Sequence, residues 1–218
     1  MLDTTLFALM HILVFVYWLG GDLGAFYSSR FLTMPDVSAD RRLMAAKIVG
    51  DVDMAPRTAL IMALPTGLLL AISKGWIATP MVWGWVTFGL GVGWLALAWY
   101  LHHTHGASAG LKQLDLAIRW LFAILLVFVG VSALIGHAND VPLFIAAKCL
   151  LLAGAVLTGL FIRRVLTPLG PALMSLSGPD AASAEMELAA TLSRARPLVM
   201  LIWLLIISAA FFGLLTPV

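Results

Sequence analysis

Three polar or aromatic side chains, His11, Trp18 and Asp22, lie in the otherwise apolar stretch 6–27, at offsets of seven and eleven residues from the histidine. On a helix these offsets place them on one face. An imidazole and a carboxylate at membrane depth are costly, and such groups usually face the protein interior, where they serve a ligand, a proton or an ion. The spacing therefore predicts a buried site in the first apolar segment.

A second candidate for chemistry is Lys148, the only lysine or arginine well inside an apolar segment. Like His11, it lies about six residues, or ~9 Å, from the outer end of its segment. A desolvated lysine either loses its proton or finds an anion, so it ligates a metal as an amine or pairs with a carboxylate as a cation. Its long stem also allows it to snorkel outward. His137, at the outer end of another segment, is a third nitrogen donor on this side, unless it is only an interfacial hydrogen-bonding residue.

The inner side carries a separate group of ionisable residues. Asp22 is expected to pair there with an arginine such as Arg57 or with a protonated histidine. Three histidines are close together in the sequence at the end of one segment: His102, His103 and His105. Because adjacent residues point in different directions on a helix, at most one of His102 and His103 joins any given site. The group is predicted either to hold helices together or to form part of a proton path.

The amino-acid composition indicates which environment surrounds the chain. Of its 218 residues, 62% are hydrophobic and 11% are charged, whereas soluble domains carry about 25% charged residues. Most of the chain must therefore contact lipid, and residues 1–218 are predicted to form a single integral membrane domain. The net charge of +2 does not indicate nucleic acid, because the basic residues lie where membrane topology would place them.

Apolar segments long enough to span a bilayer recur six times. They are expected at about 5–27, 55–73, 78–101, 119–136, 142–162 and 197–216. Backbone polar groups in hydrocarbon must be satisfied within each segment, so the segments are helices and the fold class is an all-α polytopic bundle. Residues 31–53 are expected to hold a short amphipathic interfacial helix. Residues 178–196 are expected to form either another such helix or an inward extension of the last span.

Charge asymmetry orients this bundle. Eleven basic residues fall on one side and only Lys74 on the other. The eleven are Arg30, Arg41, Arg42, Lys47, Arg57, Lys112, Arg119, Arg163, Arg164, Arg194 and Arg196. By the positive-inside rule, both termini face outward. The expected location is a bacterial inner membrane.

Several short runs resemble a known superfamily. The run from His11 to Gly21, with its histidine seven residues before Trp18, resembles the opening helix of CopD-type copper-resistance membrane domains and of HemJ-type protoporphyrinogen oxidases. The run Leu64-Pro65-Thr66-Gly67-Leu68, which follows Arg41-Arg42-Leu43, is similar to the "TGL" of that superfamily. The run 144–150, which carries Lys148 and continues to Arg163-Arg164 and Pro168, resembles the family's lysine-bearing helix. The resemblance implies a b-type haem ligated by His11 and an essential role for Lys148.

Three functions follow as expectations. The first is a haem b redox protein, and an oxidoreductase if it is an enzyme, in which His11 is the ligand and Trp18, His137, His102 and His103 are the other candidate cofactor-binding residues. Lys148 and Asp22 are its candidate catalytic residues. A pair of histidine ligands would favour electron transfer, whereas an open axial position would favour catalysis. A quinone, a porphyrin or a redox protein would be its partner, in addition to the bilayer and a second copy of the chain.

Two other classes remain open. A copper-handling permease would use His11, Met10 and His137 as metal ligands on the outer side. A non-catalytic membrane subunit or anchor would use its polar residues only to join helices. No serine–histidine–acid arrangement, Walker loop, HExxH or CxxC occurs in the sequence, so hydrolytic or nucleotide-driven chemistry is unsupported.

Overall fold

The computed structural model describes residues 2–104, 108–138 and 140–215, and these form helices without any strand. The helices, in chain order, are α1 (Leu2–Ser29), the short 3₁₀ helix η1 (Arg30–Leu32), α2 (Ala39–Val52), α3 (Met54–Ser73), α4 (Met81–His103), α5 (Ala109–Leu134), α6 (Leu143–Val165), α7 (Leu169–Ser175) and α8 (Ala181–Leu214). Within the described chain, six helical segments are long and apolar enough to cross a membrane. The predicted all-α polytopic bundle is confirmed.

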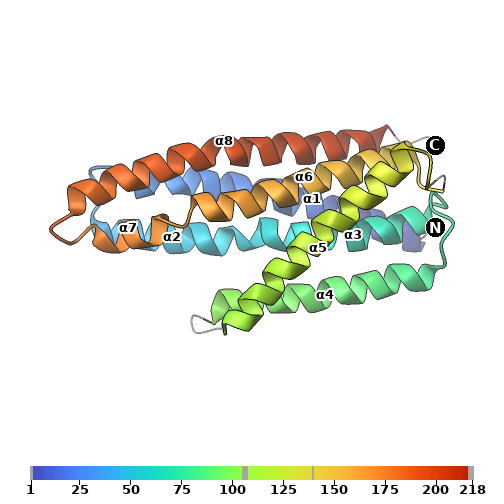
Figure 1. The fold of residues 1–218 in the computed structure, drawn as a ribbon, viewed down its shortest axis with the longest axis horizontal. Coiled ribbons are helices and arrows are strands. Elements are labelled where there is room, and N and C mark those ends of the chain that lie inside the picture. The colour runs from blue at the N-terminus through green and yellow to red at the C-terminus, as the bar shows by residue number, and fades with distance from the viewer. Residues whose placement is uncertain (1, 105–107, 139, 216–218) are drawn as a thin grey trace.

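The six long helices form a closed ring, in which each packs against the next in the order α1, α3, α4, α5, α6, α8 and back to α1. We call the end of the molecule that holds the start of α1 the outer end, following the orientation that the charge asymmetry predicts, and the opposite end the inner end. Figure 1 shows α5 crossing the bundle diagonally, from the inner end of α4 to the outer end of α6. Helix α5 packs mainly on α6 and only lightly on α4. The start of α1 and the end of α8 lie at the same end of the molecule (Figure 1), in agreement with an even number of crossings.

The interior of the ring is filled by side chains from all six helices. Its largest members are Trp18 of α1 and Trp94 of α4, with 4% and 8% of their surface exposed. Small residues allow the helices to approach closely. A Cβ on Gly21, for example, would lie 2.5 Å from Cδ of Pro56 on α3. The interior of the bundle is therefore a close-packed core, and specific polar groups lie around it.

Two spans are longer than the sequence predicted. Helix α5 begins at Ala109 instead of residue 119, and α8 begins at Ala181 instead of residue 197. Pro197, expected in a first turn, lies inside α8. The inward extension of the last span is therefore the correct alternative for residues 178–196. Both differences have one cause: hydropathy marks only the apolar band, whereas the charged residues before positions 119 and 197 lie on helices that continue beyond it.

The inner extensions form a small lobe with its own core. Its buried residues come from η1, α7 and the first half of α8: Leu32, Ala172, Leu173, Leu188 and Leu192. An ion pair joins buried Arg42 of α2 to Glu185 of α8 at 3.0 Å. The short helix expected within 31–53 is present as α2. It runs in line with α3 (Figure 1) and packs through Ala45 and Ala46 on the lobe core, so its predicted position along the membrane surface is wrong.

Candidate functional site

The outer part of α1 presents His11 to α3. Nδ1 of His11 lies 3.0 Å from the hydroxyl oxygen of Thr66. That hydroxyl donates its own hydrogen to the carbonyl of Met62, at 2.7 Å. A carbonyl can only accept, so the Thr66 oxygen accepts from His11, and Nδ1 carries the ring proton. Nε2 is then the unprotonated nitrogen with a lone pair available for a ligand.

A glycine makes room for this ring. A Cβ placed on Gly67 would lie 3.0 Å from Cε1 of His11 and 3.6 Å from Nε2. The imidazole therefore lies directly against the backbone of α3. Thr66 orients the ring, and the absence of a side chain at Gly67 leaves room for it. Two adjacent residues of α3 therefore fix the position of His11.

Lys148 of α6 belongs to the same region. Its charge acts on His11, so the two groups lie within electrostatic range. Its Nζ lies 3.0 Å from where a Cβ on Gly213 of α8 would be. Lys148 thus lies in the same outer region as His11, but no hydrogen bond joins the two side chains within the described residues.

Trp18 and Asp22 lie deeper on the same face of α1. Trp18 belongs to the main hydrophobic core, and its side chain lies close enough to the carboxyl group of Asp22 to interact with it. The expected pairing of Asp22 with an arginine or histidine is wrong for the described residues. Arg57 pairs instead with Asp53, with Nη2 at 2.5 Å from Oδ2, and Oδ2 of Asp22 is buried without a hydrogen-bond partner. Asp22 is therefore a buried acceptor about 16 Å along the helix axis from His11.

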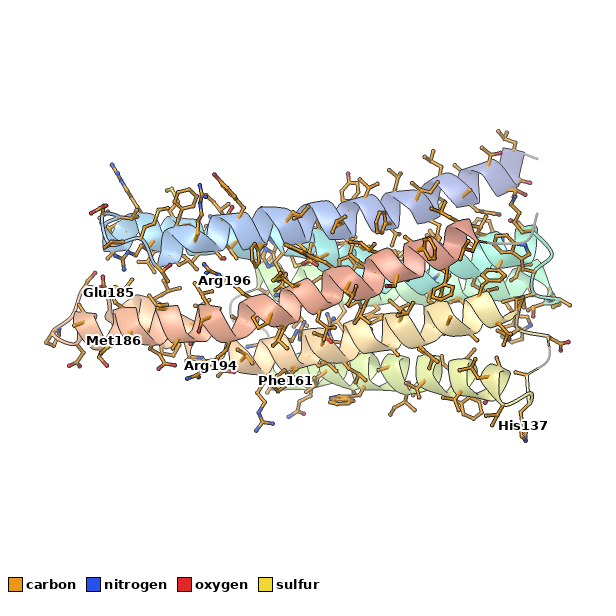
Figure 2. All side chains as sticks on the ribbon, turned by 90° about the horizontal axis from the view of Figure 1, so that it is seen from above. His137, Phe161, Glu185, Met186, Arg194 and Arg196 are labelled. Atoms are coloured by element: carbon orange, nitrogen blue, oxygen red, sulfur yellow. The ribbon has the colours of Figure 1, made fainter. Side chains whose placement is uncertain are left out.

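The other histidines lie elsewhere. His137 is exposed and points away from the bundle at its outer end (Figure 2). His102 and His103 lie at the inner end of α4, where Nε2 of His102 is 3.0 Å from Oδ1 of Asp51 and His103 stacks on Trp99. His105 lies outside the described residues. The structure thus brings none of His102, His103 and His137 to His11.

A different polar cluster, which the sequence analysis missed, lies at the inner end. Buried Asp115 of α5 accepts from Nε1 of Trp94 at 3.0 Å, from Nε of Arg119 at 2.9 Å and from Nη1 of Arg163 at 3.2 Å. One carboxylate therefore ties α4, α5 and α6 together where α4 and α5 otherwise pack lightly. The spacing of Asp115 and Arg119, four residues apart, was the available signal.

Neither cluster has the ligand set of a metal site built from protein side chains alone. Over the described ranges, no group of three or more histidine, cysteine, aspartate or glutamate residues is arranged to hold a metal ion. The outer site has instead one imidazole nitrogen and one amine. Comparison with protein-family models, with curated proteins and with solved structures found no match for this chain.

Proposed function

We propose that the chain is a membrane-embedded b-type haem protein with redox activity, in which His11 is the axial ligand. The observation that carries this proposal is the hydrogen-bond chain from His11 through Thr66 to Met62, which leaves Nε2 free. Histidines that ligate metals typically donate their other ring N–H to an oxygen acceptor, which fixes the tautomer and the orientation of the ring. The arrangement at His11 has this form.

The surrounding residues suit the same group. Gly67 lets the imidazole of His11 lie against α3, and Gly213 lets the amine of Lys148 lie against α8, so neighbouring helices hold both nitrogen donors in position. Lys148, as a cation, would pair with a carboxylate of the macrocycle, which is one of the two roles expected for a desolvated lysine. When bound, haem supplies one-electron chemistry whose potential depends on axial ligation, burial and nearby charge.

The separation of the histidines favours catalysis over simple electron transfer. His102, His103 and His137 lie away from His11, so His11 would be the only one of these histidines to hold the haem. A single histidine ligand would favour reaction with a substrate over electron transfer. The proposed activity is therefore oxidation of a porphyrin-like substrate, with a quinone or a redox protein as the electron acceptor.

The deciding experiment is an absorption spectrum of the full chain, purified in detergent after expression with ample haem supply, before and after reduction with dithionite. We expect a Soret band that is lost in His11→Ala and retained in His137→Ala, which removes an exposed histidine from the same end of the molecule. A colourless protein, or equal loss in both variants, contradicts the proposal. Copper bound without a Soret band would indicate the permease instead, and neither ligand would indicate an anchor.

A further inference from the structure

A second, separate feature lies at the inner end, where four helices surround a cavity of about 390 Å³. Small-molecule pockets commonly measure roughly 300–1,000 Å³. The cavity is lined by residues of α3, α4, α5 and α6: Arg57, Ala98, Leu101, His102, Lys112, Asp115, Arg119 and Arg163. It is at the opposite end of the bundle from His11 and does not depend on the haem proposal.

The lining is strongly cationic. Four of its residues are lysine or arginine, and Asp115 is its only carboxylate. Asp115 is shared by Arg119 and Arg163, so it neutralises only one of them. Arg57 is neutralised by Asp53. Lys112 forms no ion pair within the described chain. The cavity therefore has an excess of about two positive charges, which would attract an anion.

The hydrogen-bond donors of the cavity are held in place. Arg119 uses Nε for Asp115, and Arg163 uses Nη1, so each guanidinium keeps further N–H donors. Packing fixes Arg119, whose Cζ lies 5.4 Å from the ring centroid of Trp94 and whose side chain is only 6% exposed. Both oxygens of Asp115 already accept hydrogen bonds, so the carboxylate is occupied and the free donors determine what the cavity attracts.

Membrane topology explains the sign of these charges but not their arrangement. Arg164, Arg194 and Arg196 satisfy the positive-inside rule as exposed residues. The cavity cations converge from three helices around a buried carboxylate. Lys112 and Arg163 are themselves exposed, but the side chain of Arg119 is only 6% exposed. Burying this arginine is costly unless its charge is compensated, and Arg119 shares its one carboxylate with Arg163.

We propose that this cavity binds the dianionic head of a phosphate monoester. A phosphate carries a charge of about −1.5 to −2 and three strong acceptor oxygens, which match the excess charge and the forked donors of two arginines. The monoester belongs either to a soluble molecule on the inner side or to a lipid of the inner leaflet, because the cavity lies at the inner ends of the spans. The shared chemistry is the phosphate head.

The test measures binding to the purified full chain in detergent, at constant ionic strength, by the shift of its thermal unfolding temperature. The probes are inorganic phosphate and short-chain phosphatidic acid. Chloride and phosphatidylglycerol, a diester with one negative charge, are the control ligands. We expect inorganic phosphate or phosphatidic acid, but neither control, to raise the unfolding temperature. Response to inorganic phosphate indicates a soluble ligand, and response to phosphatidic acid alone indicates a lipid.

Substitutions of residues that line the cavity test where the phosphate group binds. Lys112→Gln and Arg163→Gln should each weaken binding at least about tenfold, since a hydrogen bond to a charged group is worth about 1.5–3 kcal/mol and 1.4 kcal/mol is tenfold. Arg164→Gln, one residue along α6 and outside the cavity lining, is the matched control and should bind normally. Lys112→Gln breaks no ion pair in the described part of the chain, so it tests binding even if Arg163→Gln folds poorly.

Two results would overturn the proposal. One is equal binding of phosphate and phosphatidic acid in Lys112→Gln, Arg164→Gln and the unaltered chain. The other is a response to phosphate and phosphatidic acid no larger than the response to chloride and phosphatidylglycerol.

Discussion

The two ends of the bundle handle polar groups differently. At the outer site, His11 has one protein hydrogen bond, to Thr66, and Lys148 forms no hydrogen bond or ion pair within the described ranges. At the inner site, Asp115 accepts three hydrogen bonds and joins two arginines. Polar groups that satisfy one another stabilise a fold, whereas groups with unused capacity are suited to a ligand. The outer side chains therefore have hydrogen-bonding capacity left for a ligand, whereas the carboxylate of Asp115 is used to join three helices.

The largest expected effect comes from breaking the inner cluster. Asp115→Asn should lower the free energy of unfolding by about 3–5 kcal/mol, because removing one partner of a buried ion pair leaves uncompensated charge. Detergent-induced unfolding followed by circular dichroism measures this change. The control is Asp36→Asn, which alters an exposed loop residue and should change stability by less than about 0.5 kcal/mol. Equal stability of the two variants would show that Asp115 does not tie the helices together.

The next largest effect is expected on haem affinity, when the hydrogen-bond acceptor of His11 is removed. Thr66→Val removes the oxygen that fixes the tautomer of His11, and loss of such a partner typically lowers affinity for the bound group about 10–100-fold. Haem titration of the apoprotein measures the affinity. Thr66→Ser should retain it. Thr87 makes the same type of hydrogen bond, to Trp83 O at 2.8 Å, so Thr87→Val is the matched control for loss of a threonine hydroxyl. Unchanged affinity in Thr66→Val would count against His11 as the ligand.

A smaller effect is expected from filling the space beside the ring. Gly67→Ala forces His11 to move by a few tenths of an ångström, whereas Gly20→Ala on α1 meets no atom within 4 Å. Overpacking costs about 1–3 kcal/mol, so Gly67→Ala should be less stable than Gly20→Ala by about 1 kcal/mol. Its haem spectrum should also shift, because the axial ligand is displaced. If the spectra of the two glycine variants are identical, Gly67 does not position the ring.

The smallest effect on stability is expected at Lys148. Lys148→Met removes a desolvated amine without breaking a hydrogen bond in the described ranges, so the free energy of unfolding should not fall. The reduction potential of the haem should nevertheless fall, since a nearby cation favours the reduced form. Potentiometric titration measures this, with Lys74→Met, on an exposed turn, as control. A potential equal to that of the control would place Lys148 outside the site.

The sequence singled out the residues of the outer site but not the inner cluster around Asp115, for a physical reason. A histidine or lysine within an apolar span is conspicuous because lipid tolerates so few polar groups, and His11 and Lys148 were found in this way. Asp115 and Arg119 lie beside Lys112 near the end of a span, where charges are also expected as topology signals. Their burial depends on α6, which brings Arg163 to Asp115 from 48 residues away. No local pattern shows that contact.

The same limit applies to the fold. Hydropathy located all six spans, because each must cover the bilayer core. It missed the polar beginnings of α5 and α8, where the helices continue into water and are stabilised by packing. In α8 that packing involves Leu188 and Leu192, which are buried in the core of the inner lobe. The orientation of His137 also depended on tertiary structure, since a histidine at a helix end has no local signal for where it points.

Helix α8 has 34 residues and is therefore about 51 Å long, against a hydrocarbon thickness of about 30 Å. Some 20 Å of it must project from the bilayer, with Glu185 and Met186 near the tip (Figure 2). Sharp kinks concentrate at prolines, and Pro197 lies between the projecting part and the embedded part that carries Gly213. Pro197 removes one backbone hydrogen-bond donor at this boundary, so a change in the direction of α8 between its projecting part and its embedded part is expected there.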